Sequence, residues 1–306
     1  MRLRHPTGRI VHLSHEIAPA PAGNLPAVIA RLDSYAAVRA VLGADALGVS
    51  LRLPPVLAAA LAVDGRARTR LRAELDIRSL EVVTLSGTPA AEGGGETDDS
   101  GWDDPGQREY ALDLARVLLD LLPEDSVRGS VNTVGLGPCT GWDDAADKAS
   151  TGLLRRLSAG LADLAWQRGR AIRVGFRPMP GYLADSAAQT VAALKRIDKD
   201  RLGVCLDLGH VARTWPDPAA GIDAIADAGL SIIEVRAGVE SGPTEESWRA
   251  ALVRLLGPRG PLTEYLTVVT PGPDPSAERI GADLAYVLNE LATLGLAPEN
   301  EPCAAR

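Results

Sequence analysis

Residues 203–212 read GVCLDLGHVA, a short apolar run that ends in Asp207, with His210 three residues further on. A buried strand normally avoids a carboxylate, so an aspartate at the end of such a run is a candidate site residue. A carboxylate close to an imidazole is suited to proton transfer, in which Asp207 orients or charge-balances His210. The alternative is structural, because Asp207 can also cap the helix that follows.

Polar side chains lie in or just after several other apolar runs. In chain order they are His12, His15, Arg52, Asn132, Arg177, Glu234 and Arg236. If these runs are parallel strands of one barrel, their carboxyl ends meet at a single mouth, where active sites form. We expect the three arginines, with Asn132, His12 and His15, to bind substrate, because guanidinium groups pair with carboxylate and phosphate oxygens.

Glu234 and His210 are the candidate acid and base at that mouth, and Asp207 completes the expected catalytic group. An ion-pair network is the alternative, with Asp207 on Arg177 and Glu234 on Arg52. Such pairs would only fill the barrel, since buried ion pairs are weak evidence of function.

The elements that must position these residues alternate between short β-branched runs and longer amphipathic stretches. The expected strands are 9–14, 47–53, 80–85, 129–134, 171–177, 202–207, 230–236 and 265–270. The expected helices are 25–42, 54–73, 105–121, 143–168, 185–195, 217–228, 243–256 and 275–294. This alternation over 306 residues is typical of a (β/α)8 barrel.

An open doubly wound sheet is the main competitor for this pattern. The first expected strand is not followed by G-x-G-x-x-G, and the sequence contains no G-x-x-x-x-G-K-[ST], which counts against that sheet. We therefore predict an α/β fold, a single (β/α)8 TIM barrel over residues 1–306. A flexible loop at 86–104 follows its third strand, and a short C-terminal tail covers 296–306.

Composition excludes several partner classes. The net charge is −8 and the pI is near 5.1, so the chain has no general positive field for nucleic acid. No stretch is typical of a membrane-spanning segment or a secretory signal, so we expect no membrane insertion. Cys139, Cys205 and Cys303 form no CxxC pair, which favours the reducing cytoplasm. The expected partner is a small-molecule metabolite, and the oligomeric state stays open.

The segments VHLSHEIAP, LGVSLRLP, VVTLSGTP, VGFRPMPG and LGVCLDLGHVA occur in this order. Together they resemble the xylose-isomerase-like TIM-barrel superfamily of sugar isomerases and epimerases, over about residues 9–295. Within it they look most like the EboE-type metabolite traffic proteins. The resemblance implies a divalent-metal site with glutamates ending the fifth and eighth strands, the aspartate of Asp-x-x-His and a polar residue of the seventh strand.

The match to that ligand set is partial. Asp207 and His210 are present and Glu234 can fill the seventh-strand position, but Arg177 stands where the first glutamate belongs. A guanidinium puts a fixed positive charge where the ion would sit, at a cost of ~4 kcal/mol for charges 4 Å apart. We therefore expect no tightly bound cofactor. A divalent ion (Mn, Mg, Zn or Fe) held by Asp207, His210 and Glu234 is the alternative.

Three functions fit these residues. The first is an isomerase- or epimerase-like enzyme with a degenerate metal site, acting by proton transfer on a small hydroxylated, anionic metabolite. The second is a non-catalytic metabolite-binding or carrier protein, which the lost ligands and the EboE-type resemblance favour. The third is a lyase or cyclase of a secondary-metabolite pathway, since the same residues could remove a proton beside a carbonyl.

Overall fold

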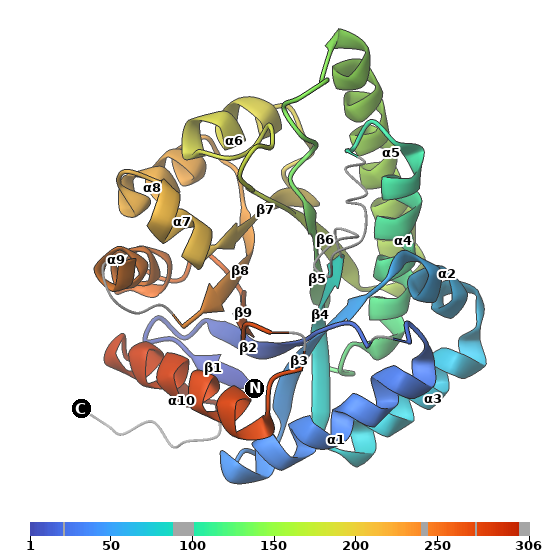
Figure 1. Ribbon diagram of the computed structural model, residues 1–306, viewed down its shortest axis with the longest axis vertical. Helices are drawn as coiled ribbons and strands as arrows, with labels where there is room; N and C mark the ends of the chain where they lie inside the picture. The colour runs from blue at the N-terminus through green and yellow to red at the C-terminus, as the bar shows by residue number, and fades with distance from the viewer. Residues whose placement is uncertain (21, 88–100, 240–243, 273, 300–306) are drawn as a thin grey trace.

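A closed parallel barrel is the centre of the molecule in this computed structural model. The structure describes residues 1–20, 22–87, 101–239, 244–272 and 274–299. Strand β2 (Ile10–Ile17) pairs in parallel with both β3 (Leu47–Leu53) and β9 (Tyr265–Val269), which closes the sheet. Figure 1 shows the helices surrounding the strands. The predicted single (β/α)8 barrel is confirmed, and the open sheet is excluded.

The remaining barrel strands follow in chain order between β3 and β9. They are β4 (Leu80–Gly87), β5 (Arg128–Val134), β6 (Ala171–Arg177), β7 (Leu202–Asp207) and β8 (Ile232–Gly238). Outside the barrel, β1 (Arg2–Arg4) pairs antiparallel with β2 and with β10 (Ala297–Pro298). Sequence patterning did not predict these two short strands, because a strand of two or three residues has no measurable alternation.

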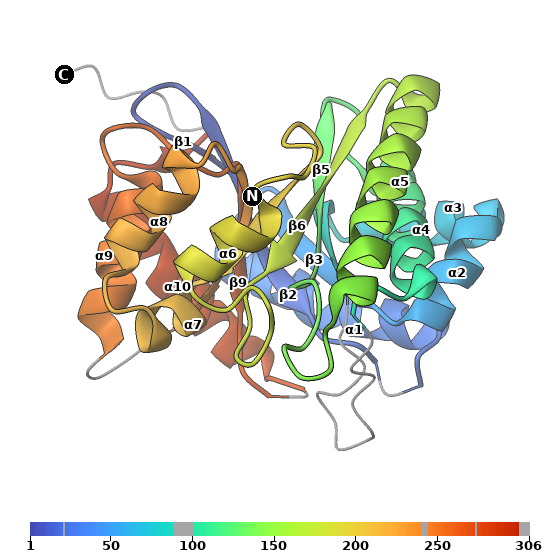
Figure 2. The same ribbon diagram turned by 90° about the horizontal axis from the view of Figure 1, so that it is seen from above.

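The helices pack against the outer face of the barrel. They are α1 (Leu25–Val41), α2 (Pro55–Val63), α3 (Gly65–Ile77), α4 (Pro105–Leu121), α5 (Asp144–Arg168), α6 (Ala187–Leu194), α7 (Leu208–Thr214), α8 (Pro218–Asp227), α9 (Glu245–Leu256) and α10 (Ala277–Thr293). Figure 2 shows α8 and α9 on one side of the strands and α3 and α4 on the other. Among the described residues, no helix combines the length and the apolar character needed to cross a membrane.

Several predicted elements differ from the structure, and the segments 54–73 and 86–104 are among them. The helix expected over 54–73 is two helices, because the side chain of Asp64 accepts hydrogen bonds from the backbone N–H groups of Arg66 and Ala67 and begins α3 there. The loop expected at 86–104 begins later, since Ser86 and Gly87 still belong to β4. Residues 88–100 of that loop and 300–306 of the expected tail lie outside the described residues.

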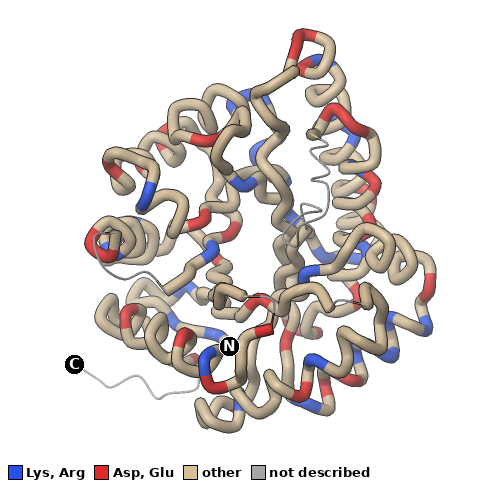
Figure 3. Tube along the Cα trace, viewed as in Figure 1, with Lys and Arg blue, Asp and Glu red and all other residues tan. Residues whose placement is uncertain are grey.

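The barrel interior is polar where barrels are usually filled by Val, Ile and Leu. The Ser14 hydroxyl oxygen lies 3.3 Å from Thr267 Oγ1 and 3.5 Å from Thr84 Oγ1. The apolar core lies instead between strands and helices, and Figure 3 shows charged positions on the outer helices and also on central strands. The barrel is therefore built to hold polar groups at its centre.

Two register shifts help to set which side chains face inward. Along β3 and β4 the pairing passes from Val49–Val82 to Ser50–Thr84, so Val83 has no counterpart in β3. Along β7 and β8 it passes from Val204–Ile232 to Cys205–Glu234, so Ile233 is likewise extra. Such one-residue bulges redirect the side chains beyond them and are common beside active sites.

Candidate functional site

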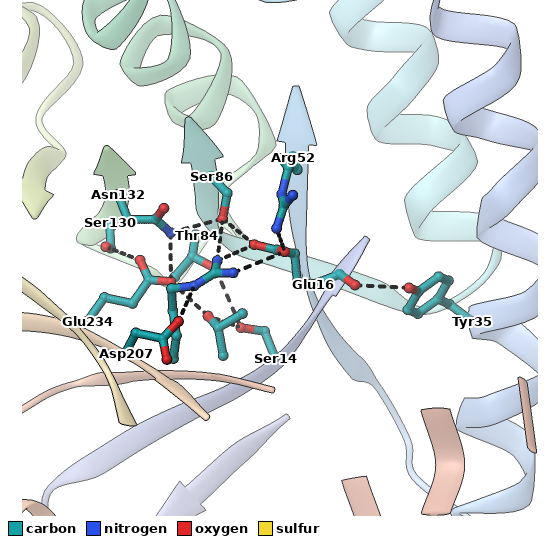
Figure 4. Close-up of polar contacts among 12 residues, drawn as sticks. Ser14, Glu16, Tyr35, Arg52, Thr84, Ser86, Ser130, Asn132, Asp207 and Glu234 are labelled. Atoms are coloured by element: carbon teal, nitrogen blue, oxygen red, sulfur yellow. Dashed lines mark hydrogen bonds and ion pairs between the residues drawn. The ribbon is translucent and has the colours of Figure 1, made fainter. Parts of the chain in front are cut away.

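A buried ion cluster forms around Glu16 at the carboxyl end of the barrel. Oε1 of Glu16 contacts the Arg52 guanidinium, and both carboxylate oxygens contact Arg236, whose Nη2 lies 3.2 Å from Oε1. The Ser86 hydroxyl donates a hydrogen bond of 2.8 Å to Oε2. Figure 4 shows Arg52 and Ser86 converging on Glu16. One carboxylate therefore serves two guanidinium groups.

Glu16 was not among the residues predicted from the sequence. The first strand was expected to end at residue 14, but β2 continues to Ile17. Side chains alternate along a strand, so the inward side of His12 and Ser14 also includes Glu16. Continuing that alternation by two residues was the signal that could have found it.

The charge on Glu16 is fixed by its surroundings. Burial by itself raises the pKa of this carboxyl, but the positive charges of Arg236 and Arg52 outweigh burial and hold the pKa well below 4.5. Burial lowers the pKa of Arg236, and Glu16 more than reverses that effect, so the pKa is raised overall. Glu16 is therefore a structural anion and a poor base.

A cavity of about 370 Å³ opens beside this cluster. Its charged lining consists of Glu16, Arg31, Arg52, Arg177, Asp207, Arg236 and Asp274, with Tyr35 and Thr270 also at the wall. Arg177 is only 8% exposed, and the described residues provide it with no hydrogen bond or ion pair. Burial and the charge of Arg236 lower the pKa of Arg177. The cavity thus contains a buried guanidinium whose donors are uncommitted.

Asp207 has a structural role and also reaches the cavity. One oxygen, Oδ1, accepts a hydrogen bond of 3.1 Å from the backbone N–H of His210 and caps α7. The other, Oδ2, lies 3.8 Å from Nε of Arg236, and the side chain is 31% exposed. Of the ion pairs considered from the sequence, Glu234 with Arg52 is wrong, because Glu234 is held by Ser130, Asn132 and Thr267 and Arg52 contacts Glu16. Against the larger effect of burial, the charge of Asp207 raises the pKa of Arg177, but the two side chains form no ion pair within 4 Å.

Glu234 lies within the barrel rather than at its mouth. It is fully buried and accepts hydrogen bonds from Ser130 Oγ at 2.7 Å, Thr267 Oγ1 at 2.9 Å and Asn132 Nδ2 at 3.0 Å. Burial raises its pKa. Asn132 also donates to Ser86 Oγ at 2.9 Å, which connects Glu234 to the Glu16 cluster (Figure 4).

The predicted histidines do not line the cavity. His210 Nε2 lies 3.1 Å from Oδ1 of Asp185. His15 Nε2 lies 2.9 Å from Thr270 Oγ1, and its ring packs beside Tyr35. His12 stacks on the Tyr265 ring and lines a hollow at the opposite end of the barrel.

The structure therefore brings only some of the predicted site residues together. Arg52, Arg177, Arg236 and Asp207 line the mouth cavity, whereas Asn132, Glu234, His12, His15 and His210 lie away from it. Burial lowers the pKa of both His12 and His15 to about 4, so each ring is neutral near pH 7.

These residues do not fit a divalent metal. In the described part of the chain, no three His, Cys, Asp or Glu side chains are grouped so that they could hold an ion. The alternative ligand set of Asp207, His210 and Glu234 is not assembled, because each contacts different partners. A hard cation needs several carboxylate oxygens, and the cavity offers a guanidinium at Arg177 instead.

Comparison with known proteins agrees with the barrel. Residues 36–238 match the family model described as xylose isomerase-like TIM barrel. The chain belongs to this family. No curated protein matches the chain.

Solved structures of the family's fold superpose over most of its length. D-allulose 3-epimerase from Methylomonas sp. is 15% identical, with a TM-score of 0.62 over 92% of this chain and 98% of that one. A xylose isomerase-like TIM barrel protein from Mycobacterium smegmatis, in complex with magnesium, is 18% identical, with a TM-score of 0.58 over 92% and 97%. D-psicose 3-epimerase from Clostridium cellulolyticum H10, with D-tagatose, is 13% identical, with a TM-score of 0.61 over 92% and 98%. At such identities the likeness concerns the fold.

Proposed function

We propose that this family member is an isomerase- or epimerase-like enzyme that moves a proton on a small hydroxylated anion bound in the barrel mouth. The observation that carries the proposal is Arg177, a buried guanidinium in the cavity that makes no hydrogen bond or ion pair with the described residues. Burying an unpaired charge is costly, and an anionic ligand would supply the missing counter-charge. A cavity of about 370 Å³ is within the usual size for small-molecule sites.

Asp207 is the base in this proposal. Its carboxylate reaches the cavity and, unlike Glu16, is not in contact with two guanidinium groups. It would take a proton from a carbon beside a carbonyl and return it to the same or a neighbouring carbon. Arg177 and Arg236 would stabilise the negative charge that develops on the substrate oxygen. The epimerases among the similar structures make this reaction class a natural choice.

The other acid and base residues expected from the sequence take supporting roles in this proposal. Glu234 holds Asn132, and through it Ser86, in place beneath the cluster. His210 holds Asp185 beside α7. Neither side chain reaches a ligand in the cavity, so neither is assigned a direct proton transfer.

A non-catalytic metabolite-binding or carrier protein is the second candidate. The observation that favours it is that Glu16, a buried carboxylate of the mouth, is held by two arginines. Among the described carboxylates of the cavity, Asp207 is then left to move protons, since Asp274 pairs with Arg31. We also propose an EboE-type assignment and a cytoplasmic location, and a lyase or cyclase role in secondary metabolism stays a third candidate.

Solvent-proton exchange separates the two candidates. Ligands found by thermal shift among sugars, hydroxy acids and their phosphates are incubated with the protein in D2O and followed by NMR. We expect the wild type to introduce deuterium at carbon, and Asp207→Asn to bind the ligand without exchanging it. If the wild type binds a ligand but never exchanges its carbon-bound protons with solvent, the enzyme proposal is contradicted and the carrier protein remains.

Arg177→Met tests the ligand's charge in the same assay, and we expect it to abolish binding. Arg196→Met is the matched control, because Arg196 is exposed and does not line the cavity. Unchanged ligand binding by Arg177→Met would contradict the proposal, because it would show that the ligand does not need the Arg177 charge.

A further inference from the structure

We infer that the mouth cavity selects a hydroxylated monocarboxylate over a phosphate ester that carries two negative charges. The inference rests on the proposed function and specifies its substrate class. Its basis is the balance of charge around the cavity, together with the way in which the helices after β8 and β9 begin.

Among the described residues, the lining of the cavity has one more positive than negative charge. Three guanidinium groups, of Arg52, Arg177 and Arg236, face two carboxylates, of Glu16 and Asp207. A further pair at the wall, Arg31 and Asp274, lies 3.8 Å apart and cancels itself. One monoanion therefore balances the charge of the described lining, whereas a dianion exceeds it by one negative charge.

The uncompensated charge belongs to Arg177. Arg52 and Arg236 already contact the oxygens of Glu16, and Asp207 lies 3.8 Å from Arg236 Nε. The planar guanidinium of Arg177 can present two parallel N–H donors, which match the two oxygens of one carboxylate. The geometry therefore offers one bidentate position for one carboxylate.

The usual place for a phosphate in this fold carries acidic residues instead. TIM barrels often bind phosphate after their seventh and eighth strands, at a helix N-terminus where positive partial charge attracts anions. Here the helices after those strands, α9 and α10, have Glu245, Glu246 and Glu278 in their first turns. These carboxylates compensate the N-terminal partial charge and repel a phosphate.

A matched ligand series tests the inference directly. D-gluconate, D-sorbitol and D-sorbitol 6-phosphate share a six-carbon polyol chain and carry one, no and two negative charges near pH 7.5. Isothermal titration at constant ionic strength gives their affinities. We expect D-gluconate to bind at least about tenfold more tightly than either of the others.

Each outcome has a distinct meaning. Tighter binding of the phosphate than of D-gluconate overturns the inference and leaves the proposed anion site intact. Equal binding of D-sorbitol and D-gluconate contradicts the anionic substrate of the proposed function itself. Binding of none of the three overturns both.

Two variants change the charge balance by one unit in opposite directions. Asp207→Asn removes one negative charge and so makes the net charge of the cavity more positive by one unit. It keeps a cap for α7, since asparagine and aspartate are equally good at the N-cap position. We expect it to improve phosphate affinity relative to D-gluconate by about tenfold. Arg177→Met removes the surplus charge, so D-gluconate should then bind no more tightly than D-sorbitol. The control Arg196→Met should keep the wild-type order of affinities. Unchanged relative affinities in both cavity variants, with native circular dichroism, would refute the charge-balance argument.

Discussion

The Glu16 cluster makes a quantitative prediction for Glu16→Gln. This substitution keeps the shape of the side chain but leaves the guanidinium groups of Arg52 and Arg236 buried without their anion. Removing one partner of a buried pair costs about 3–5 kcal/mol. Unfolding entropy of ~2.1 cal/mol/K per residue over 306 residues converts this cost into a melting point about 5–8 °C lower.

The pH dependence of that loss has a definite sign. The pKa of Glu16 in the fold is held below 4.5, so its stabilisation is complete above 4.5 and is lost as pH falls through the folded pKa. Urea unfolding of wild type and Glu16→Gln should therefore give a constant difference from about pH 8 to pH 5 and a smaller one in more acidic buffer.

Glu245→Gln is the matched control, because Glu245 forms a partly exposed pair with Arg249 and should change stability by less than about 1 kcal/mol. Equal unfolding midpoints for wild type and Glu16→Gln at pH 7 would refute the reasoning. A stability difference between wild type and Glu16→Gln that already decreases between pH 7 and pH 5 would refute the reasoning as well.

Three further predictions concern buried titratable groups. Glu234 has a raised pKa, so its protonation stabilises the fold at low pH and this is lost as pH rises from 4.5 through the folded value. Glu234→Gln should therefore gain stability relative to wild type on going from pH 4.5 to 8 in urea titrations, and a constant difference would contradict this. NMR titration of His12 and His15 should give midpoints near 4, not near 6.5. Cys205, buried and with a raised pKa, should not react with DTNB in the native protein, so Cys205→Ser should leave the native thiol count unchanged.

The barrel could be predicted because its evidence is periodic. Strands 47–53, 171–177 and 202–207 coincide with β3, β6 and β7, since a strand buried on both faces is a continuous apolar run. The site was harder to predict, because the side chains that reach it depend on the alternation along each strand and on the register between strands. Arg177 and Asp207 end their strands and could be placed at the mouth from sequence.

Glu16 and Glu234 show what the sequence could not supply. Glu16 was missed because the strand boundary was set two residues before it, and strand ends are where patterning is weakest. Glu234 was expected at the mouth, but its depth depends on how β8 is staggered against its neighbours. It lies opposite Cys205 and Tyr265, one layer below Arg236. The stagger between neighbouring strands is set by closure of the whole barrel, so no local sequence pattern indicates it.

The extra residue in β8 has a consequence for how this charged mouth could arise or disappear. Deleting Ile233 would remove the bulge but leave Glu234 opposite Cys205 and Arg236 opposite Asp207, because Ile233 is the residue that has no counterpart in β7. A straight strand that kept Ile233 would instead place Glu234 opposite Leu206, so Glu234 and Arg236 would point toward the helices and Val235 would point inward. The loss of this one residue can therefore be absorbed without turning an ionic side chain, whereas a strand of the same length without the bulge would exchange the ionic barrel lining for an apolar one.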